Sequence, residues 1–199
     1  MLPNKQMLQL KDNLSFILKY IKDKNNVIFL DYPLYHNVGD LLIFQGTQKF
    51  FKDNGIKVKM YRSALDYNIE ELKKNIDPQT TLICQGGGNF GDLYDTHQNL
   101  RVSLVTNFKN NRIIILPQTA HFSNEQKLNQ NIAIFKQHSD VILFARDAKT
   151  FELFQKFTDK THLMPDMAHQ LYGELPISDV TISHPLYFLR VDKEKNDIQ

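Results

Sequence analysis

The chain has 199 residues, of which 42% are hydrophobic and 11% aromatic, so it can fill a core and is too apolar for a disordered protein. Its formal net charge is only +2, and the basic residues are scattered among acidic ones, which argues against a nucleic-acid-binding protein. The single cysteine excludes an intrachain disulfide, and with no signal-peptide pattern and no long apolar run, the sequence predicts a cytoplasmic protein without an integral membrane segment.

The predicted elements alternate between helix and strand about six times. Apolar residues spaced by three and four predict a first helix over residues 5–24, packed on the domain; a helix lying on a membrane surface is the alternative. The other helices are predicted over residues 40–55, 68–76, 95–110, 123–139 and 149–157, with Asp40, Ser123 and Asp147 as their N-caps where one is recognised. Strands are predicted over residues 27–33, 57–63, 80–87, 112–119, 141–147 and 161–168.

Four of these strands, near residues 27, 82, 113 and 141, are apolar on both faces. Strands of this kind belong to a parallel sheet covered by helices on each side, so the sequence predicts an α/β fold with a doubly wound, mostly parallel, Rossmann-like sheet. Ligands of such sheets bind where the strands end and the loops lead into helices. We expect this domain to span residues 1–176, and residues 177–199 to form a linker and the first strand of a second domain.

Six motifs occur in an order and spacing that resembles the polysaccharide pyruvyl transferase family. They are "HNVGD" (36–40), "GGGNFGDL" (86–93), "ILPQT" (115–119), "ARDAKTFELF" (145–154), "MPDMA" (164–168) and "YFLRVDKE" (187–194). The resemblance implies a GT-B-like architecture of two Rossmann-like halves, of which this chain supplies the N-terminal half. It also implies transfer of pyruvate from phosphoenolpyruvate onto a sugar, which forms a ketal in exopolysaccharide or other glycan synthesis. The family's main phosphoenolpyruvate-binding arginines and histidine are expected in the second half.

The stretch "TLICQGGGNFGDLYD" places four of the chain's 8 glycines within six residues, after a buried strand. One interpretation is that the N–H groups of Gly86, Gly87 and Gly88 face a phosphate or a sugar oxygen, with Asn89 and Asp92 adding polar side chains at the same rim. The alternative is a tight turn that lets a helix pack closely on the strand. The motif fits neither the Walker nor the dinucleotide pattern, so we expect neither ATP nor NAD.

Asp40 opens a predicted helix after "NVG", where backbone N–H groups and the helix dipole favour an ionised carboxylate. With the family resemblance, the functional interpretation is a catalytic base or a hydrogen-bond acceptor for the sugar hydroxyls; the alternative is a simple N-cap. Asn37 and Gly39 shape the same loop and are expected to contribute to substrate binding.

Three further polar residues stand at predicted strand ends. Gln118 is a candidate for contact with a sugar hydroxyl, Arg146 for contact with an anion, and Asp166 for a position facing the cleft. The alternatives are a turn residue, an ion pair with a neighbouring carboxylate and a structural turn, respectively. No histidine has a metal-ligand spacing, so we predict neither a bound metal nor a cofactor apart from the donor substrate.

Two other functions stay open from the sequence. One is half of a sugar-nucleotide glycosyltransferase on a similar fold, since fold alone does not decide function. The other is a non-catalytic binding module. The partners expected from the resemblance are a sugar or glycan acceptor and phosphoenolpyruvate; the sequence leaves open a peripheral contact with a lipid-linked acceptor, and does not indicate the oligomeric state.

Overall fold

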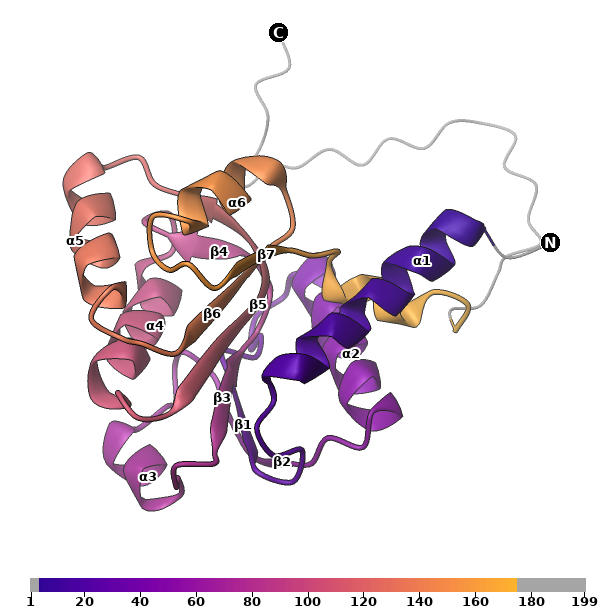
Figure 1. The fold of residues 1–199 in the computed structure, drawn as a ribbon, viewed down its shortest axis with the longest axis horizontal. Coiled ribbons are helices and arrows are strands. Elements are labelled where there is room, and N and C mark those ends of the chain that lie inside the picture. Colours follow the sequence, from indigo (N-terminus) through magenta and orange to yellow (C-terminus); the bar gives the residue numbers. More distant parts are fainter. Residues whose placement is uncertain (1–3, 175–199) are drawn as a thin grey trace, which may run out of the picture.

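A parallel sheet forms the centre of the computed structural model, which describes residues 4–174 (Figure 1). Its strands are β1 (Val27–Leu30), β2 (Val58–Arg62), β3 (Thr81–Cys84), β4 (Gly87–Gly91), β5 (Arg112–His121), β6 (Val141–Ala145) and β7 (Thr161–Leu163). They lie in the order β2-β1-β3-β5-β6-β7, with β4 paired to β5, and each of these pairings is parallel. The predicted α/β class with a parallel sheet is therefore confirmed.

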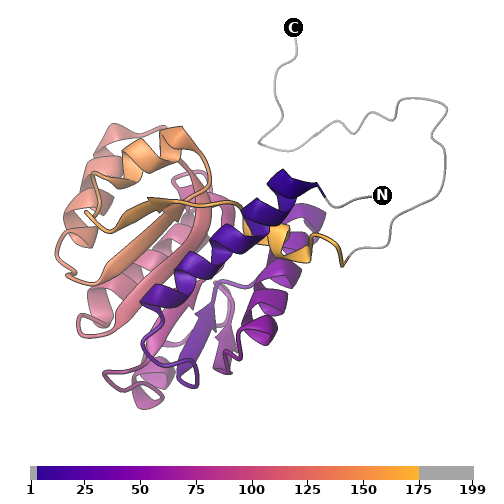
Figure 2. The same ribbon diagram turned by 45° about the vertical axis from the view of Figure 1, so that its right-hand side comes forward.

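Helices cover both faces of the sheet, as Figures 1 and 2 show. They are α1 (Lys5–Asn13), the 3-10 helix η1 (Leu14–Tyr20), α2 (Val38–Asp53), α3 (Ile69–Lys74), α4 (Asp95–Asn107), α5 (Glu125–Phe135), α6 (Ala148–Phe154) and the 3-10 helix η2 (Met167–Leu171). The layer of α3, α4, α5 and α6 lies on one face, and α1, η1, α2 and η2 lie on the other. This is the doubly wound arrangement that the sequence predicts.

Alternate residues of the central strands enter two separate cores. Ile28 and Leu30 of β1 face the layer that contains α4, whereas Phe29 faces the layer that contains α2. All four residues of β1 are fully buried. A strand that is covered on both sides needs apolar residues at every position, which explains the continuous apolar runs in the sequence.

The first predicted helix is shorter than expected. Its apolar stripe does pack on the domain, because Leu14 and Ile17 are fully buried, but the chain tightens into a 3-10 helix at Leu14 and leaves helical geometry after Tyr20. Tyr20 is held there by a hydrogen bond of 2.6 Å between its hydroxyl and His162 Nε2. Tertiary contacts at this end therefore override the helical periodicity of residues 5–24.

Two predicted N-caps are wrong and one is confirmed. Helix α2 is capped by Asn37, whose Oδ1 accepts from the N–H groups of Gly39 and Asp40, so Asp40 lies inside the first turn. Asn124, and not Ser123, caps α5. Asp147 caps α6 as predicted, accepting from Thr150 N. In both wrong cases an asparagine has the extended backbone that a cap requires: Asn37 lies three residues before Asp40, and Asn124 directly follows Ser123.

The glycine-rich segment is a strand and not a bend. After a break at Gln85 and Gly86, β4 continues the line of β3 along β5, so that β3 pairs with residues 112–115 and β4 with residues 118–121. A Cβ atom at Gly91 would lie 1.8 Å from the carbonyl oxygen of His121, and Gly91 has φ +121°. Close approach of the two backbones is therefore the physical reason for this glycine.

We predict that Gly91→Ala destabilises the fold by about 1–3 kcal/mol more than Gly55→Ala, because only the first change forces a side chain into a packed backbone. Gly55 is a matched control, since it also has positive φ, +66°, but has open space around its missing Cβ. Urea unfolding of the two variants measures the difference. Equal losses of stability would contradict a steric requirement at Gly91.

Candidate functional site

A pocket of about 340 Å³ lies at the carboxyl ends of the central strands. We call it the strand-end pocket; its lining residues are Tyr35, Asn37, Gly39, Asp40, Ile43, Gly88, Asn89, Tyr94, His97 and Arg146. Residues 35–40 follow β1, and residues 88–89 follow β3, its neighbour in the sheet. The chain runs from β1 outward to β2 and then returns to β3 on the other side, so the pocket sits where doubly wound sheets bind ligands.

Asp40 and the glycine-rich strand adjoin in this pocket, as the sequence predicts. A Cβ atom at Gly87 would lie 3.0 Å from Asp40 Oδ1, so the missing side chain leaves room for the carboxylate. Tyr35 hydrogen-bonds to Asp40, and burial together with the carboxylates of Asp40 and Asp31 raises the pKa of Tyr35 well above its usual range. The phenol therefore stays protonated and serves as a hydrogen-bond donor to Asp40.

Below the pocket, Asp31 and Arg101 form an ion pair that is fully buried on both sides. Arg101 Nη2 lies 2.6 Å from Asp31 Oδ2, and the same guanidinium donates to Asn89 O at 2.8 Å and to Asn89 Oδ1 at 2.5 Å. Asp31 follows β1 with φ +66°, an uncommon conformation for a residue other than glycine. The pair therefore joins the end of β1, strand β4 and helix α4.

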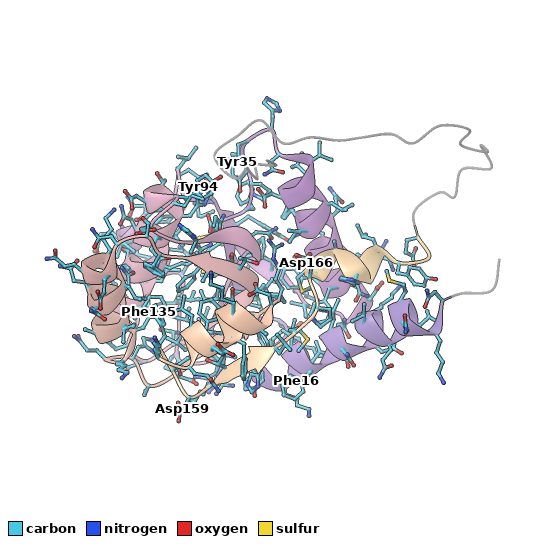
Figure 3. All side chains as sticks on the ribbon, turned by 90° about the horizontal axis from the view of Figure 1, so that it is seen from above. Phe16, Tyr35, Tyr94, Phe135, Asp159 and Asp166 are labelled. Carbon is cyan, nitrogen blue, oxygen red and sulfur yellow. The ribbon has the colours of Figure 1, made fainter. Side chains whose placement is uncertain are left out.

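His97 connects this buried pair to the pocket. Its Nδ1 lies 2.5 Å from Asp31 Oδ1, and its side chain is 16% exposed. The ring packs edge-on against Tyr35 and Tyr94, with centroids 5.6 and 6.3 Å apart. Figure 3 shows these two tyrosines near each other in the view from above. An imidazole held on one side by a carboxylate is thus presented to a ligand-sized space on the other.

Gln118 supports the pocket from beneath and does not line it. Its side chain is fully buried; Nε2 donates to Gln85 O at 2.8 Å and to Asn89 Oδ1 at 3.2 Å. Its Oε1 accepts from Asn89 N at 3.3 Å. The predicted contact with a sugar hydroxyl therefore does not fit the structure, because the amide is used to position Asn89.

Arg146 lines the pocket from the end of β6 and is held by two neighbours. Its Nε donates to Thr119 Oγ1 and its Nη1 to Asp166 Oδ2, both at 2.8 Å. Its side chain is 31% exposed, so part of the guanidinium can still meet an anion. Asp166 caps η2 and pairs with Arg146; among the described residues it is a neighbour of the pocket and not part of its lining.

The structure brings six of the predicted site residues together at the strand-end pocket: Asn37, Gly39, Asp40, Gly88, Asn89 and Arg146. Gly86 and Gly87 serve the sheet and leave room for its neighbours. Asp92 lies elsewhere: its carboxylate accepts from the N–H groups of Ser123 and Asn124 at 2.9 and 2.8 Å, at the start of α5. The interpretation of Asp92 as part of the same rim is therefore wrong.

Sequence reasoning missed Asp31, Tyr35, Tyr94, His97 and Arg101. One local signal existed: His97 and Arg101 are four residues apart, which places them on one face of α4. Their shared partner, Asp31, is more than sixty residues away in the chain and directly follows an apolar strand. No local pattern indicates that pairing.

Three other expectations concern metals, the single thiol and membrane spans. Among residues 4–174, no group of three or more His, Cys, Asp or Glu side chains is placed to hold a metal ion. Cys84 is fully buried in β3, and burial raises the pKa of its thiol to about 12, so it behaves as a small hydrophobic side chain. None of the helices in this part of the chain is both long enough and apolar enough to cross a bilayer.

Fold and pocket together define a Rossmann-like domain whose polar strand-end site is formed mainly by the segment after β1 and by strand β4. The pattern of the polysaccharide pyruvyl transferase family matches residues 37–198, and the chain belongs to this family. The resemblance inferred from the motifs is thereby confirmed.

Three relatives show how much of such proteins this chain represents. The candidate pyruvyl transferase EpsO of Bacillus subtilis is 38% identical over 192 residues, which cover 96% of this chain and 58% of EpsO. Pyruvyl transferase 1 of Schizosaccharomyces pombe is 31% identical, with 94% of this chain and 50% of the relative covered. General stress protein 30 of Bacillus subtilis is 30% identical, with coverage of 88% and 53%. The chain thus spans about half the length of these relatives. The predicted second-domain strand near Leu186 lies outside the described residues.

We predict that Arg101→Met costs about 3–5 kcal/mol of folding stability, because it leaves the buried carboxylate of Asp31 without its cationic partner. The control is Arg112→Met. Arg112 pairs with Asp140, but that carboxylate is 20% exposed and keeps Lys160 as a second partner. The control should lose about 1 kcal/mol or less. Urea unfolding measures both, and similar losses would show that the buried pair has no special structural role.

Proposed function

We propose that the protein transfers a pyruvyl group from phosphoenolpyruvate to two hydroxyls of a sugar in a polysaccharide or its precursor, forming a pyruvate ketal. The chain described here supplies the acceptor side of the site. The observation that carries this proposal is the convergence of a carboxylate, an imidazole and a guanidinium on one pocket, at Asp40, His97 and Arg146. Membership of the polysaccharide pyruvyl transferase family supports the reaction class.

The reaction sets clear chemical demands. Protonation of the methylene carbon of phosphoenolpyruvate makes C2 an oxocarbenium ion, and two sugar hydroxyls add to C2 in turn while its bond to the phosphate oxygen breaks. Both hydroxyls lose a proton. One of these protons balances the proton taken up by the methylene carbon, and the other leaves with phosphate. A site for this reaction needs proton acceptors for the hydroxyls and cations for the carboxylate and the phosphate.

The lining residues meet the acceptor side of these demands. Asp40, in the first turn of α2, is the proposed proton acceptor or hydrogen-bond acceptor for a sugar hydroxyl. Asn89, only 7% exposed and fixed by Arg101 and Gln118, offers a rigid polar group at the pocket floor. Arg146, which directly follows β6, is the proposed contact for an anionic group of the donor.

The proposal extends to the cellular compartment of the protein and to the kind of glycan synthesis in which it acts. We infer a cytoplasmic protein that acts in exopolysaccharide or related glycan synthesis and uses phosphoenolpyruvate, without another cofactor. The single buried thiol is in keeping with a reducing compartment. The polysaccharide specificity is inferred from the family.

Ligand-dependent heat stability tests the donor. In the full-length protein that carries this chain, phosphoenolpyruvate should raise the melting temperature, because a ligand that binds only the folded state stabilises it. UDP-sugars should not. Stabilisation by a UDP-sugar and none by phosphoenolpyruvate would instead favour the glycosyltransferase alternative.

We predict that Asp40→Asn lowers ketal formation by about 10²–10⁴-fold, the usual contribution of a positioned proton acceptor. Folding stability should change little, since Asn37 and not Asp40 caps α2. Glu125→Gln is the matched control: Glu125 also lies in the first turn of a helix, but outside the pocket. Phosphate release assays and thermal melts give the two readouts. Wild-type turnover in Asp40→Asn would remove Asp40 from the proposed mechanism.

A further inference from the structure

We propose that His97 is a second catalytic proton acceptor, which takes the proton of one sugar hydroxyl and passes it to the leaving phosphate, and that Asp31 and Arg101 are its positioning residues. This inference rests on the proposed function, since it assigns a role within the same pocket. It arises from a feature absent from the family motifs quoted above: a buried carboxylate that joins a buried arginine to a pocket-lining histidine.

The tautomer of His97 follows from its partner. An ionised carboxylate only accepts hydrogen bonds, so Nδ1, at 2.5 Å from Asp31 Oδ1, carries a proton. In the neutral imidazole this leaves the lone pair on Nε2. Within the described part of the chain no side chain or backbone group hydrogen-bonds to Nε2, and the ring lines the pocket. The nitrogen available to a ligand is therefore the basic one.

Arg101 gives the buried carboxylate of Asp31 its cationic partner. Burying a carboxylate is costly unless it is paired, and Asp31 is fully buried. Its two oxygens are divided: Oδ1 contacts His97 and Oδ2 contacts Arg101 at 2.6 Å. Asp31 directly follows β1 and has a positive φ. A strained backbone of this kind persists only where the surrounding contacts hold it in place.

The surroundings of His97 place it in the same network as Asp40. The ring of Tyr35 packs against His97, and the hydroxyl of Tyr35 hydrogen-bonds to Asp40. One tyrosine therefore contacts both proposed proton acceptors. Tyr94, which immediately precedes α4, also packs against His97, and Arg146 lines the pocket at the end of β6. Two proton acceptors on separate elements, α2 and α4, match a reaction in which two hydroxyls must each lose a proton.

As the first hydroxyl oxygen bonds to C2 of the protonated donor, its O–H bond breaks and the proton bonds to Nε2 of His97. The imidazolium is stabilised by Asp31 through Nδ1–H. When the bond between C2 and the phosphate oxygen breaks, the Nε2 proton moves to the leaving phosphate, and His97 returns to its neutral form. No oxidant, reductant or further reactant is needed.

The test measures turnover with phosphoenolpyruvate and a panel of methyl glycosides of glucose, galactose and mannose, in the full-length protein. His97→Asn places an amide N–H where Nδ1–H lies, so it retains a donor for Asp31 but cannot relay a proton, and it should lower kcat/KM by about 10²–10⁴-fold. His97→Ala should lose as much and recover part of its activity when imidazole is added. His121→Gln, at an exposed strand end outside the pocket, is the control and should stay near wild type. Near-normal turnover in His97→Asn, or no recovery of His97→Ala by imidazole while its fold is intact, would overturn the role.

A second measurement does not depend on turnover. The imidazole nitrogen signals of ¹⁵N-labelled protein report which nitrogen carries the proton at neutral pH. We expect His97 protonated on Nδ1, and a change of this pattern in Asp31→Asn if that variant folds. A wild-type His97 protonated on Nε2 would overturn the proposal. Wild-type protein that transfers nothing from phosphoenolpyruvate would refute the proposed function instead, and the nitrogen signals would still decide the assignment of His97.

Discussion

The buried ion pair between Asp31 and Arg101 is the interaction on which the pocket depends. It is fully buried on both sides and joins three elements that are distant in the chain: the end of β1, strand β4 through Asn89, and helix α4. A buried charge pair of this kind seldom adds net stability compared with apolar residues of similar size. Its value lies in geometry, because it fixes the backbone of Asn89 and the ring of His97 beside Asp40. A pocket built on it is preorganised before any ligand arrives.

The glycine-rich strand satisfies a second constraint, which comes from the sheet. Strand β4 must run beside β5 so closely that a side chain at Gly86 or Gly91 would collide with the carbonyl oxygens of Pro117 or His121. The missing side chain at Gly87 leaves room for the carboxylate of Asp40, and the next residue, Gly88, lines the pocket. The expected tight turn against a helix is therefore a strand that packs closely against β5. Close backbone approach explains Gly86 and Gly91, and room for the carboxylate of Asp40 explains Gly87.

Much of the fold could be predicted from the sequence, because it depends on local patterns. Continuous apolar runs indicated buried parallel strands, and both β1 and β6 are fully buried. The meeting of Asp40 with the glycine-rich segment followed from the rule that strand ends share one edge of the sheet. The cap of α2 was misplaced because Asn37 and Asp40 both suit a helix start, and only the backbone conformation distinguishes them. The predictions for Gln118 and Asp92 were wrong for a similar reason. A polar side chain near the end of a strand can bind a ligand or make hydrogen bonds within the protein, and the sequence does not distinguish the two roles.

The residues that were missed owe their roles to tertiary contacts. Nothing in the sequence distinguishes Asp31 from the other acidic residues. Its role follows from the fold, in which His97 and Arg101 of α4 contact its two carboxylate oxygens. Placing these three together requires helix α4 to meet the end of β1 in the folded chain, which no motif encodes. The sequence therefore indicates only part of the site. The loop after β1 and the strand after β3 can be recognised, whereas the buried contacts of Asp31 with His97 and Arg101 cannot.

The most direct measurement is a crystal structure of the full-length protein with a bound methyl glycoside. We expect a sugar ring in the strand-end pocket, with its hydroxyls in hydrogen-bond contact with the carboxylate of Asp40 and with Nε2 of His97. A sugar bound at another face of the domain, with the strand-end pocket left to solvent, would contradict this expectation.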